Sequence, residues 1–303
     1  LQTMFTWARS RNVPVLGELG LFARALKTLA ERERLPYRPK VLAITGTNGK
    51  TTVTSLTGLL LQRAGVNVAV AGNIGPALLD VLSQALDAEA VAEAADALKA
   101  AAEAEAAAGT PLPEAWLPAD PGERPPATAE AATTEAETEE AAEDEGPVQL
   151  VPPALQLPQP PHLPTVWVLE LSSFQLDGVA GGAWDHVPTA ATVLNITEDH
   201  LDWHGSLAAY AQAKAAIFGT QALMLLNRDD PQVMAMKPAL VTVKVSGRNR
   251  QQPARPYATF GLGAPTRPGD WGIEAVNGME WLVRALALDE TRKRGRAADA
   301  EDE

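Results

Sequence analysis

Short apolar strands alternate with helical segments along most of this chain, and this alternation restricts the possible folds more than any other feature. Apolar runs of strand length occur at residues 41–45, 67–71, 165–171, 191–197 and 222–227. Helical patterns lie at 51–64 and 206–218. Apolar strands separated by helices form parallel sheets that are covered on both faces. The sequence therefore predicts an α/β fold, with a mostly parallel sheet and helices on both faces.

The pattern changes after about residue 238, where short strands are broken by Gly and Pro. These strands, at 241–246, 257–261 and 280–283, predict a small antiparallel edge near the C-terminal end. The charged residues from 291 to 303 predict a loose tail.

Residues 85–164 differ in composition from the sequence on both sides. The part at 85–108 is rich in Ala and Glu and favours a helix, 111–146 has almost no large apolar residues, and 151–164 has a proline every few positions. Such a segment buries too little apolar area to offset its ordering entropy, so we interpret it as an insertion, with one helix followed by disorder. A docking arm for a partner is the alternative. The 223 residues outside it suffice for one substantial core, which we place at 37–290.

Charge and cysteine content exclude several classes of protein. Residues 87–145 contain 17 acidic and 2 basic side chains, a net −15, so the rest of the chain carries +2 when the whole carries −13. Non-specific nucleic-acid binding needs clustered Lys and Arg, and we expect none. The chain has no cysteine, which excludes a disulfide scaffold, a thiolate zinc site and a cysteine nucleophile, and fits a reducing compartment. No apolar run approaches the ~18 residues of a membrane span, and the first 15 residues lack the apolar core of a secretory signal.

The strand at 41–45 leads into a glycine-containing loop and then directly into a helix. The loop consists of Gly46, Thr47, Asn48, Gly49, Lys50, Thr51 and Thr52. Glycines let backbone N–H groups approach phosphate oxygens, and the helix N-terminus adds partial positive charge. Lys50 can reach the β- and γ-phosphates, and the Thr51 hydroxyl can ligate Mg²⁺. Ile44 stands where the generic pattern has its first glycine, so the loop is shorter, and a plain strand-to-helix turn is the alternative.

Acidic and polar residues follow the predicted strands, at the edge where open parallel sheets bind ligands. Glu170 ends an apolar strand and is placed to ligate a hard cation opposite the phosphate loop. The alternative is that its carboxylate only caps a turn at the end of the strand. Residues 198–204 carry five acidic or histidine side chains after the next strand. Among them we favour His200 as a ligand for a second metal or a phosphate. The other histidines are interpreted as surface residues: His162, His186 and His204.

Lys214 lies on the apolar face of the predicted helix at 206–218, for which Ser206 is the N-cap. It shares helical spacing with Leu207 and Tyr210, so it points inward. Burying a lysine costs free energy unless its amine is paired or chemically altered. The alternative is that the stem of Lys214 lies along the apolar face and its amine reaches the rim of the core. In the turn at 72–75, Asn73 either brings an amide close to a ligand or is only part of the turn.

These motifs together resemble the Mur ligase family of ATP-dependent amide-forming enzymes, to which folylpolyglutamate synthases are related. The resemblance rests on residues 45–52, 72–75 and 195–202. The string from Leu169 to Leu176 is similar in particular to the branch of the family that adds D-glutamate.

The resemblance implies roles for the nucleotide and metal ligands. Residues 46–52 would hold the ATP phosphates, with Lys50 on the β/γ region. Thr51 and Glu170 would ligate one Mg²⁺, and His200 would help to bind a second.

It also implies roles for three further residues and a reaction. Lys214 would be carbamylated and ligate metal, and Asn73 and Ser173 would lie near a UDP-muramoyl substrate. The γ-phosphoryl group would pass to the substrate carboxylate, and the amine of D-glutamate would then displace phosphate. Such an enzyme would serve peptidoglycan precursor synthesis in the cytoplasm, and hence cell-wall formation, cell shape and division.

The motifs cover only part of the family's architecture. Mur ligases have three domains, and these motifs belong to the central ATP-binding one, so residues 1–36 are interpreted as the connection from an N-terminal UDP-binding domain. We expect this chain alone to bind ATP weakly and to form no amide. The alternatives are another Mur-type or folylpolyglutamate-type ligase, and a non-catalytic nucleotide-binding fragment.

Overall fold

The structure, a computed structural model, describes residues 6–108, except 9, 12, 14, 34 and 74, and residues 162–287, except 246 and 247. The chain divides into two compact units, one of residues 1–92 with 159–303 and one of residues 93–158. The expectations for the insertion beyond residue 108 and for the tail from 291 lie outside the described residues. The helix that the composition of 85–108 predicts is present as the later part of α4 (Leu78–Ala108).

A six-stranded parallel sheet forms the centre of the larger unit. Its strands run in the order β2-β3-β1-β4-β5-β8, and every neighbouring pair is parallel. Their bounds are β1 (Lys40–Thr45), β2 (Val68–Gly72), β3 (Val166–Glu170), β4 (Ala190–Val193), β5 (Leu223–Asn227) and β8 (Tyr257–Phe260). The predicted α/β fold class is confirmed, and the central position of β1 places the loop that follows it in the middle of one edge.

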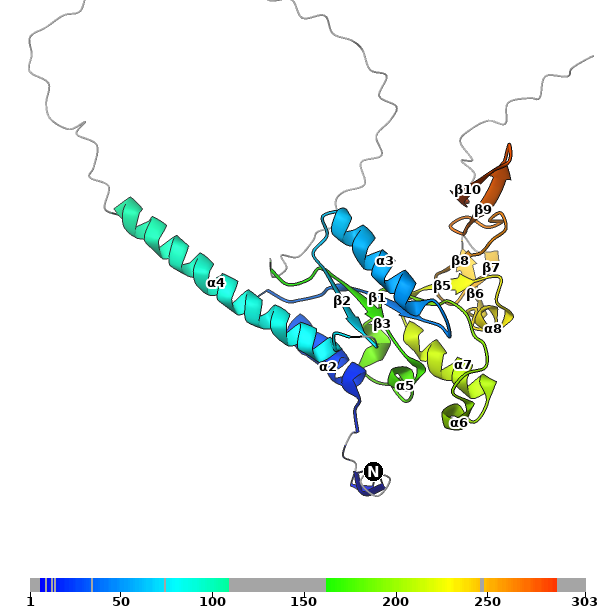
Figure 1. The fold of residues 1–303 in the computed structure, drawn as a ribbon, viewed down its shortest axis with the longest axis horizontal. Coiled ribbons are helices and arrows are strands. Elements are labelled where there is room, and N and C mark those ends of the chain that lie inside the picture. The colour runs from blue at the N-terminus through cyan, green and yellow to red at the C-terminus, as the bar shows by residue number, and fades with distance from the viewer. Residues whose placement is uncertain are drawn as a thin grey trace, which may run out of the picture. The chain divides into compact units, whose positions relative to one another are not determined.

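Helices cover this sheet on both faces. Figure 1 shows α3 (Lys50–Arg63) along one side, and α2 (Glu18–Ala30) with the beginning of α4 along the other. The short α5 (Ser173–Leu176) and α6 (Leu201–His204) follow β3 and β4, and α7 (Leu207–Ala215) continues into a 3-10 turn, η2 (Ala216–Phe218). A second such turn, η1 (Ala183–His186), precedes β4, and α8 (Pro231–Met234) follows β5.

The core beneath α2 is built on Trp167 of β3. Its indole lies edge-on to Phe22, with ring centroids 5.1 Å apart. Its Nε1 donates to the Tyr37 hydroxyl at 2.7 Å, and that hydroxyl donates to the Pro164 carbonyl at 2.6 Å. Every polar atom of this buried pair is therefore satisfied, which removes the desolvation cost of burying them.

The strands beyond residue 238 are arranged differently from the prediction. β6 (Leu240–Val245) pairs with β7 (Arg248–Pro253), and β9 (Trp271–Val276) with β10 (Met279–Arg284), as two separate antiparallel sheets. The antiparallel reading of 257–261 is wrong, because β8 joins β5 in parallel. Two parallel strands need a long crossover connection between them, which is usually a helix. Between β5 and β8 this connection consists of the short α8 and the β6–β7 hairpin. In sequence, a crossover that contains a hairpin looks like a run of short antiparallel strands. This explains why 257–261 was assigned to an antiparallel edge.

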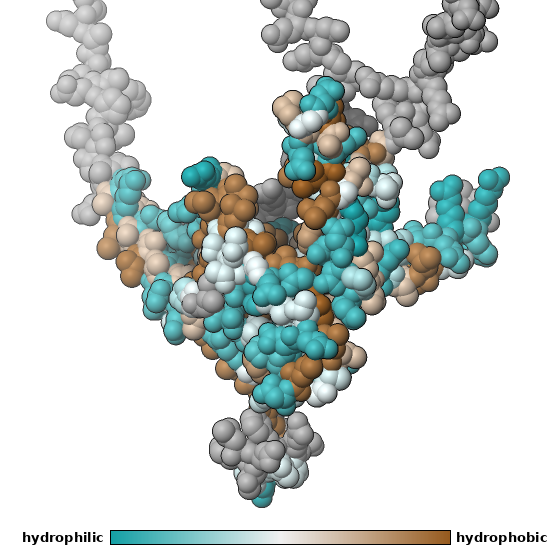
Figure 2. All heavy atoms as spheres, turned by 45° about the vertical axis from the view of Figure 1, so that its right-hand side comes forward, coloured by the Kyte–Doolittle hydropathy of each residue, from teal (hydrophilic) through white to brown (hydrophobic). Residues whose placement is uncertain are grey.

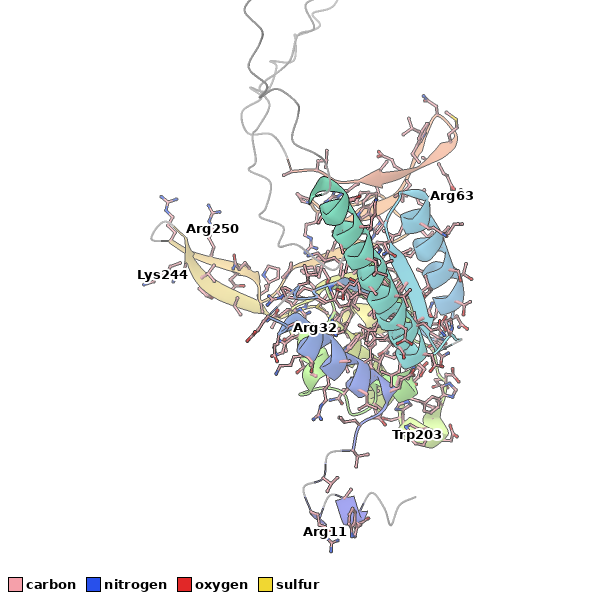
Figure 3. The ribbon with its side chains drawn as sticks, turned by 90° about the vertical axis from the view of Figure 1, so that its left-hand side faces the viewer. Arg11, Arg32, Arg63, Trp203, Lys244 and Arg250 are labelled. Carbon is pink, nitrogen blue, oxygen red and sulfur yellow. The ribbon has the colours of Figure 1, made fainter. Side chains whose placement is uncertain are left out.

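Apolar side chains also reach the surface of the larger unit, where Figure 2 shows them interspersed with hydrophilic ones. On α3, Leu56, Leu59 and Leu60 are exposed. Figure 3 shows Lys244 and Arg250 extending from the β6–β7 hairpin. Within the part of the chain that the structure describes, no helix is both long enough and apolar enough to cross a membrane.

Candidate functional site

The loop between β1 and α3 ends in a glycine that the backbone requires. Gly49 is the residue before α3 and has φ +80°, a left-handed conformation that side chains disfavour. This turn starts α3 at Lys50, so the first N–H groups of the helix open toward the loop. Lys50 Nζ folds back and donates to the Thr47 carbonyl at 2.9 Å. The loop thus collects one cation and several backbone donors, the composition of a phosphate site.

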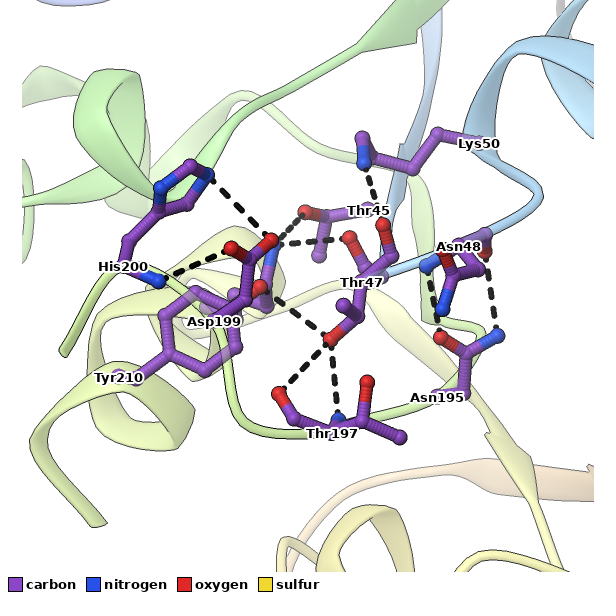
Figure 4. A network of polar contacts seen from close by, with 11 residues as sticks. Thr45, Thr47, Asn48, Lys50, Asn195, Thr197, Asp199, His200 and Tyr210 are labelled. Carbon is purple, nitrogen blue, oxygen red and sulfur yellow. Dashed lines mark hydrogen bonds and ion pairs between the residues drawn. The ribbon is translucent and has the colours of Figure 1, made fainter. Parts of the chain in front are cut away.

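Two residues that follow β4 brace this loop (Figure 4). Asn195 Oδ1 accepts from Asn48 N at 2.8 Å, and its Nδ2 donates to Asn48 O at 3.1 Å. Thr47 Oγ1 accepts from Thr197 N at 3.0 Å and lies 3.2 Å from the Tyr210 hydroxyl of α7. The loop is therefore held in shape by side chains and backbone from two other parts of the chain, before any ligand binds.

Glu170 lies beside the start of α3. Its carboxylate accepts from the Thr51 hydroxyl, with Oγ1 3.0 Å from Oε2, and from the Asn73 amide at 3.4 Å. The side chains come from β3, α3 and the turn after β2, which parallel pairing brings to the same edge. The residue is 1% exposed. Three residues predicted from separate motifs are thus in direct contact.

The oxygens of Thr51 and Glu170 fit a magnesium ion. Mg²⁺ takes oxygen ligands at about 2.1 Å in an octahedron, in which adjacent ligands lie roughly 3.0 Å apart. Both groups are oxygen donors of the kind that Mg²⁺ takes, and they lie side by side, joined by the hydrogen bond between Oγ1 and Oε2. Among the described residues there is no group of three or more His, Cys, Asp or Glu side chains that could hold a metal.

Lys214 is buried at the inner side of the loop, and only 2% of it is exposed. The predicted inward direction is confirmed, and the alternative of a stem that reaches solvent is wrong. Its Nζ donates to Gly46 O at 2.9 Å and to Thr45 Oγ1 at 3.2 Å, and lies 4.8 Å from the centre of the Tyr210 ring. Ser206 caps this helix as predicted, accepting from Ala209 N at 3.2 Å.

Burial makes Lys214 unusually easy to deprotonate. The pKa of its amine is lowered to about 7, mainly by loss of solvation and secondly by the nearby charge of Lys50, while Asp199 acts in the opposite direction. Among the described residues, the hydrogen-bond partners of Nζ are a carbonyl and a hydroxyl, and none of them is a carboxylate. Near neutral pH a substantial fraction of the amine is therefore in its neutral, nucleophilic form.

His200 joins the site through its neighbours. Its Nε2 lies 3.4 Å from Asp199 Oδ2, and its ring lies 4.7 Å from that of Phe174 and 6.4 Å from that of Tyr210. The imidazole is 44% exposed. The residue itself has φ +51° at the start of α6, which directs its side chain back toward the loop, as Figure 4 shows.

Two residues have surroundings that differ from the prediction: Ser173, a predicted substrate contact, and His204, which was interpreted as a surface residue. Ser173, at the start of α5, is 2% exposed, and its hydroxyl has no hydrogen-bond partner among the described residues. Its neighbour Ser172 instead caps α5, with Gln175 completing a capping box. His204 is half-buried, not a surface residue, and its ring stacks on Phe174 with centroids 6.0 Å apart. The interpretation of His204 as a surface residue is therefore wrong, because α6 turns its ring inward.

Sequence reasoning did not select Thr45, Asn195 or Tyr210 for the site. Asn195 had a signal, since a polar residue directly after a buried strand lies at the ligand edge of a parallel sheet. Tyr210 had none, because its spacing made it a core residue. It is in the core by burial, yet its hydroxyl reaches Thr47 of the loop.

Comparison with known proteins identifies similar sequences. Residues 147–258 match the Mur ligase middle domain family. A UDP-N-acetylmuramoylalanine–D-glutamate ligase of Albidiferax ferrireducens is 46% identical over 292 residues, which cover 96% of this chain and 41% of that protein. Proteins with the same name from Polaromonas sp. and Burkholderia multivorans are 47% identical over 265 residues and 41% identical over 309 residues. They are matched over 32% and 44% of their own lengths, so this chain spans less than half of each of these relatives.

Proposed function

We propose that this chain, whose residues 147–258 match the Mur ligase middle domain family, is the ATP-binding part of a ligase of that family that adds D-glutamate to UDP-N-acetylmuramoyl-L-alanine. The name of the relatives supports the choice of substrates. We place the ATP-binding domain at 37–290, interrupted by 85–164, and the enzyme in the cytoplasm.

One observation carries the proposal. The phosphate loop with Thr51, Glu170, His200 and the buried Lys214 come from four separate segments and meet at one edge of the sheet. An ordinary strand-to-helix turn needs none of these partners. A triphosphate with its cations and an acceptor carboxylate needs all of them.

The phosphate loop would bind and orient ATP. Backbone N–H groups of residues 46–52 and the start of α3 would face the phosphate oxygens. Lys50, which now donates to the Thr47 carbonyl, would exchange this contact for a γ-phosphate oxygen. Its charge would offset the repulsion between the incoming carboxylate and the triphosphate.

Thr51 and Glu170 would hold one Mg²⁺, and His200 would contribute to a second. When bound, the ions neutralise charge on the transferring phosphoryl group. Asn73 would keep the Glu170 carboxylate in place, because its amide donates to the oxygen that Thr51 does not bond.

The reaction would proceed in two balanced steps. A carboxylate oxygen of the acceptor attacks the γ-phosphorus, the bond to the β-phosphate oxygen breaks, and ADP leaves. The amine of D-glutamate then attacks the acyl carbon, inorganic phosphate leaves, and the amine loses a proton. Activation is needed because an unmodified carboxylate has no suitable leaving group. Asn73 and Ser173 would contact the muramoyl side, which for Ser173 requires its buried hydroxyl to turn outward.

Lys214 would be carbamylated. Its neutral Nζ attacks the carbon of CO₂, an N–C bond forms and one proton is released. The product is an anionic carboxylate-like group next to the loop, and it converts a costly buried amine into a ligand for a cation. Mass and ¹³C NMR spectra of the protein in ¹³C-bicarbonate would show the adduct, and Lys214→Arg would lack it.

Product analysis tests the proposed function. The 303-residue chain and the full-length product of its gene are incubated with ATP, Mg²⁺, UDP-N-acetylmuramoyl-L-alanine and a panel of amino acids. We expect the full-length protein to release phosphate and form amide with D-glutamate only, and Lys50→Ala to abolish both. Amide formation with another amino acid would identify a sister ligase. No phosphate release from the full-length protein would favour the non-catalytic alternative.

A further inference from the structure

Residues 194–197, which follow β4, are attached to the phosphate loop along one side. Leu194 N donates to Thr45 O at 2.9 Å, and Thr47 N donates to Asn195 O at 2.9 Å. The side chains of Asn195 and Thr47 add the contacts described above (Figure 4). The loop can therefore keep its shape only while this segment stays in place.

Two side chains from the end of β5 and the turn after it hold the other side of the segment. The backbone pairing of β4 with β5 ends at Val193. Beyond that point, Asn227 Nδ2 donates to Leu194 O at 2.8 Å. Asp230 Oδ2 then accepts from Ile196 N at 2.8 Å. These side chains thus continue the sheet past its last backbone pair, where the phosphate loop needs support.

Asp230 makes more contacts than the cap of a helix requires. Its Oδ1 accepts from Gln232 N at 2.8 Å and from Val233 N at 3.1 Å, which is an N-cap of α8. The cap does not need Oδ2, which accepts from Ile196, 34 residues earlier in the chain. Ile196 is 5% exposed, so its N–H has little access to water as a replacement acceptor.

Only a side chain with two acceptor oxygens can serve both partners of Asp230. Asparagine caps helices as well as aspartate does, but it would turn an NH₂ group toward the Ile196 N–H. Serine also caps helices, but it has a single oxygen. The carboxylate is therefore explained by the link to Ile196, and not by the cap alone.

We propose that Asp230, together with Asn227, is a positioning residue for the phosphate loop. In this role its carboxylate contacts the backbone of Ile196 and not the nucleotide, and its effect reaches the loop through Asn195. The inference rests on the proposed function of the loop as an ATP site. It adds that the binding conformation depends on residues beyond β5 that belong to none of the sequence motifs described above.

Hydrogen exchange of the 303-residue chain, followed by NMR, tests the link without a ligand. Asp230→Asn keeps the cap of α8 and removes the acceptor of the Ile196 N–H. We expect the amides of Ile196, Thr47 and Asn48 to exchange about 10-fold faster, because their hydrogen bonds depend on this contact. The amides that the cap protects and the melting temperature should change little.

Kinetics of the full-length protein give a second readout. Asp230→Asn should raise KM for ATP about 10-fold and leave KM for the acceptor and for D-glutamate unchanged. A variant that merely unfolds more easily has fewer active molecules, which lowers kcat and leaves KM unchanged. Asp230→Ser, which also keeps the cap, should behave in the same way as Asp230→Asn.

Asp185→Asn is the matched control. Asp185 also accepts a backbone N–H, that of Gly181 at 3.0 Å, but it lies in η1 before β4, so neither exchange of the loop nor KM should change. Unchanged loop exchange, an unchanged KM for ATP, equal effects in the control, or failure of both Asp230 variants to fold would overturn this inference alone. A wild-type protein that does not use ATP would overturn the proposed function and this inference with it.

Discussion

Lys214 shows how burial gives a side chain its chemistry. The amine is enclosed by Thr45, Gly46 and Tyr210, and its hydrogen bonds go to neutral acceptors. Because burial penalises the charged form, the amine becomes a nucleophile without a neighbouring base. The helix spacing of the sequence predicted that Lys214 points inward. It could not predict the acceptors, which lie 168 and 169 residues earlier in the chain.

Stability should therefore depend on pH through Lys214. The folded pKa is about 7, well below the value of 10.5 for an unperturbed lysine. The unfolded chain binds more protons than the folded one between these values, so this residue's contribution to the free energy of unfolding rises with pH from about 7 to 10.5. Denaturant unfolding in CO₂-free buffer should show a gain of about 2 kcal/mol between pH 7 and 9, relative to Lys214→Met.

The comparison with Lys214→Met removes the contributions of other titrating groups. Equal pH slopes for the wild-type chain and Lys214→Met would mean that the amine is not desolvated as the structure indicates. A slope of opposite sign would mean that it is charged and paired.

At the scale of elements, the close approach of β2 to β3 positions the acidic end of β3. Gly72 has φ +134°, and a Cβ there would lie 2.0 Å from the Glu170 carbonyl oxygen. Only glycine allows the two strands to pair up to the last residue of each, Gly72 beside Glu170. Asn73 N then donates to that same carbonyl at 2.9 Å.

Gly72→Ala should destabilise the larger unit by at least ~2 kcal/mol, because backbone atoms must move to admit the methyl group. It should also displace Glu170 from Thr51 and weaken Mg²⁺-dependent nucleotide binding. Thermal unfolding and calorimetry measure the two effects. The matched control is Gly65→Ala, which shares a positive φ of +75° but has open space around its Cβ, and should cost only ~1 kcal/mol. Equal losses in the two variants would refute the close-approach argument.

Elements with strong local patterns were predictable, and those that depend on distant partners were not. The strand that precedes the phosphate loop and the strand that ends at Glu170 are short apolar runs. The observed ends of both strands lie within one residue of the predicted ends. β8 was assigned to the wrong sheet, because nothing in its own sequence records that its partner is β5. β9 was missed because Gly272 and Glu274 interrupt its apolar residues, so no apolar run of strand length marks it, and its partner is the neighbouring strand β10.

At the scale of the whole molecule, the fold depends on the larger unit. The described core cluster draws all its residues from outside 93–158. The sequence predicted a boundary of this kind from composition, since the segment has too few apolar residues to contribute to a core.

Replacing residues 93–158 by a flexible Gly/Ser linker of about ten residues should leave the larger unit folded. Closing a shorter loop costs less entropy, which adds about 1–2 kcal/mol to its free energy of unfolding. The melting temperature should stay equal or rise by a few degrees. A variant that melts several degrees lower, or does not fold, would show that the segment contributes to the core.

The central claim is that the loop at 46–52 and the residues gathered around it bind ATP with Mg²⁺. The most direct measurement is a calorimetric titration of the 303-residue chain with ATP, with and without Mg²⁺. We predict weak, saturable, Mg²⁺-enhanced binding to one site, weakened at least 10-fold by Lys50→Ala and unchanged by Lys40→Ala, which removes an exposed lysine at the other end of β1. No binding, or equal affinities of the two variants, would contradict the account.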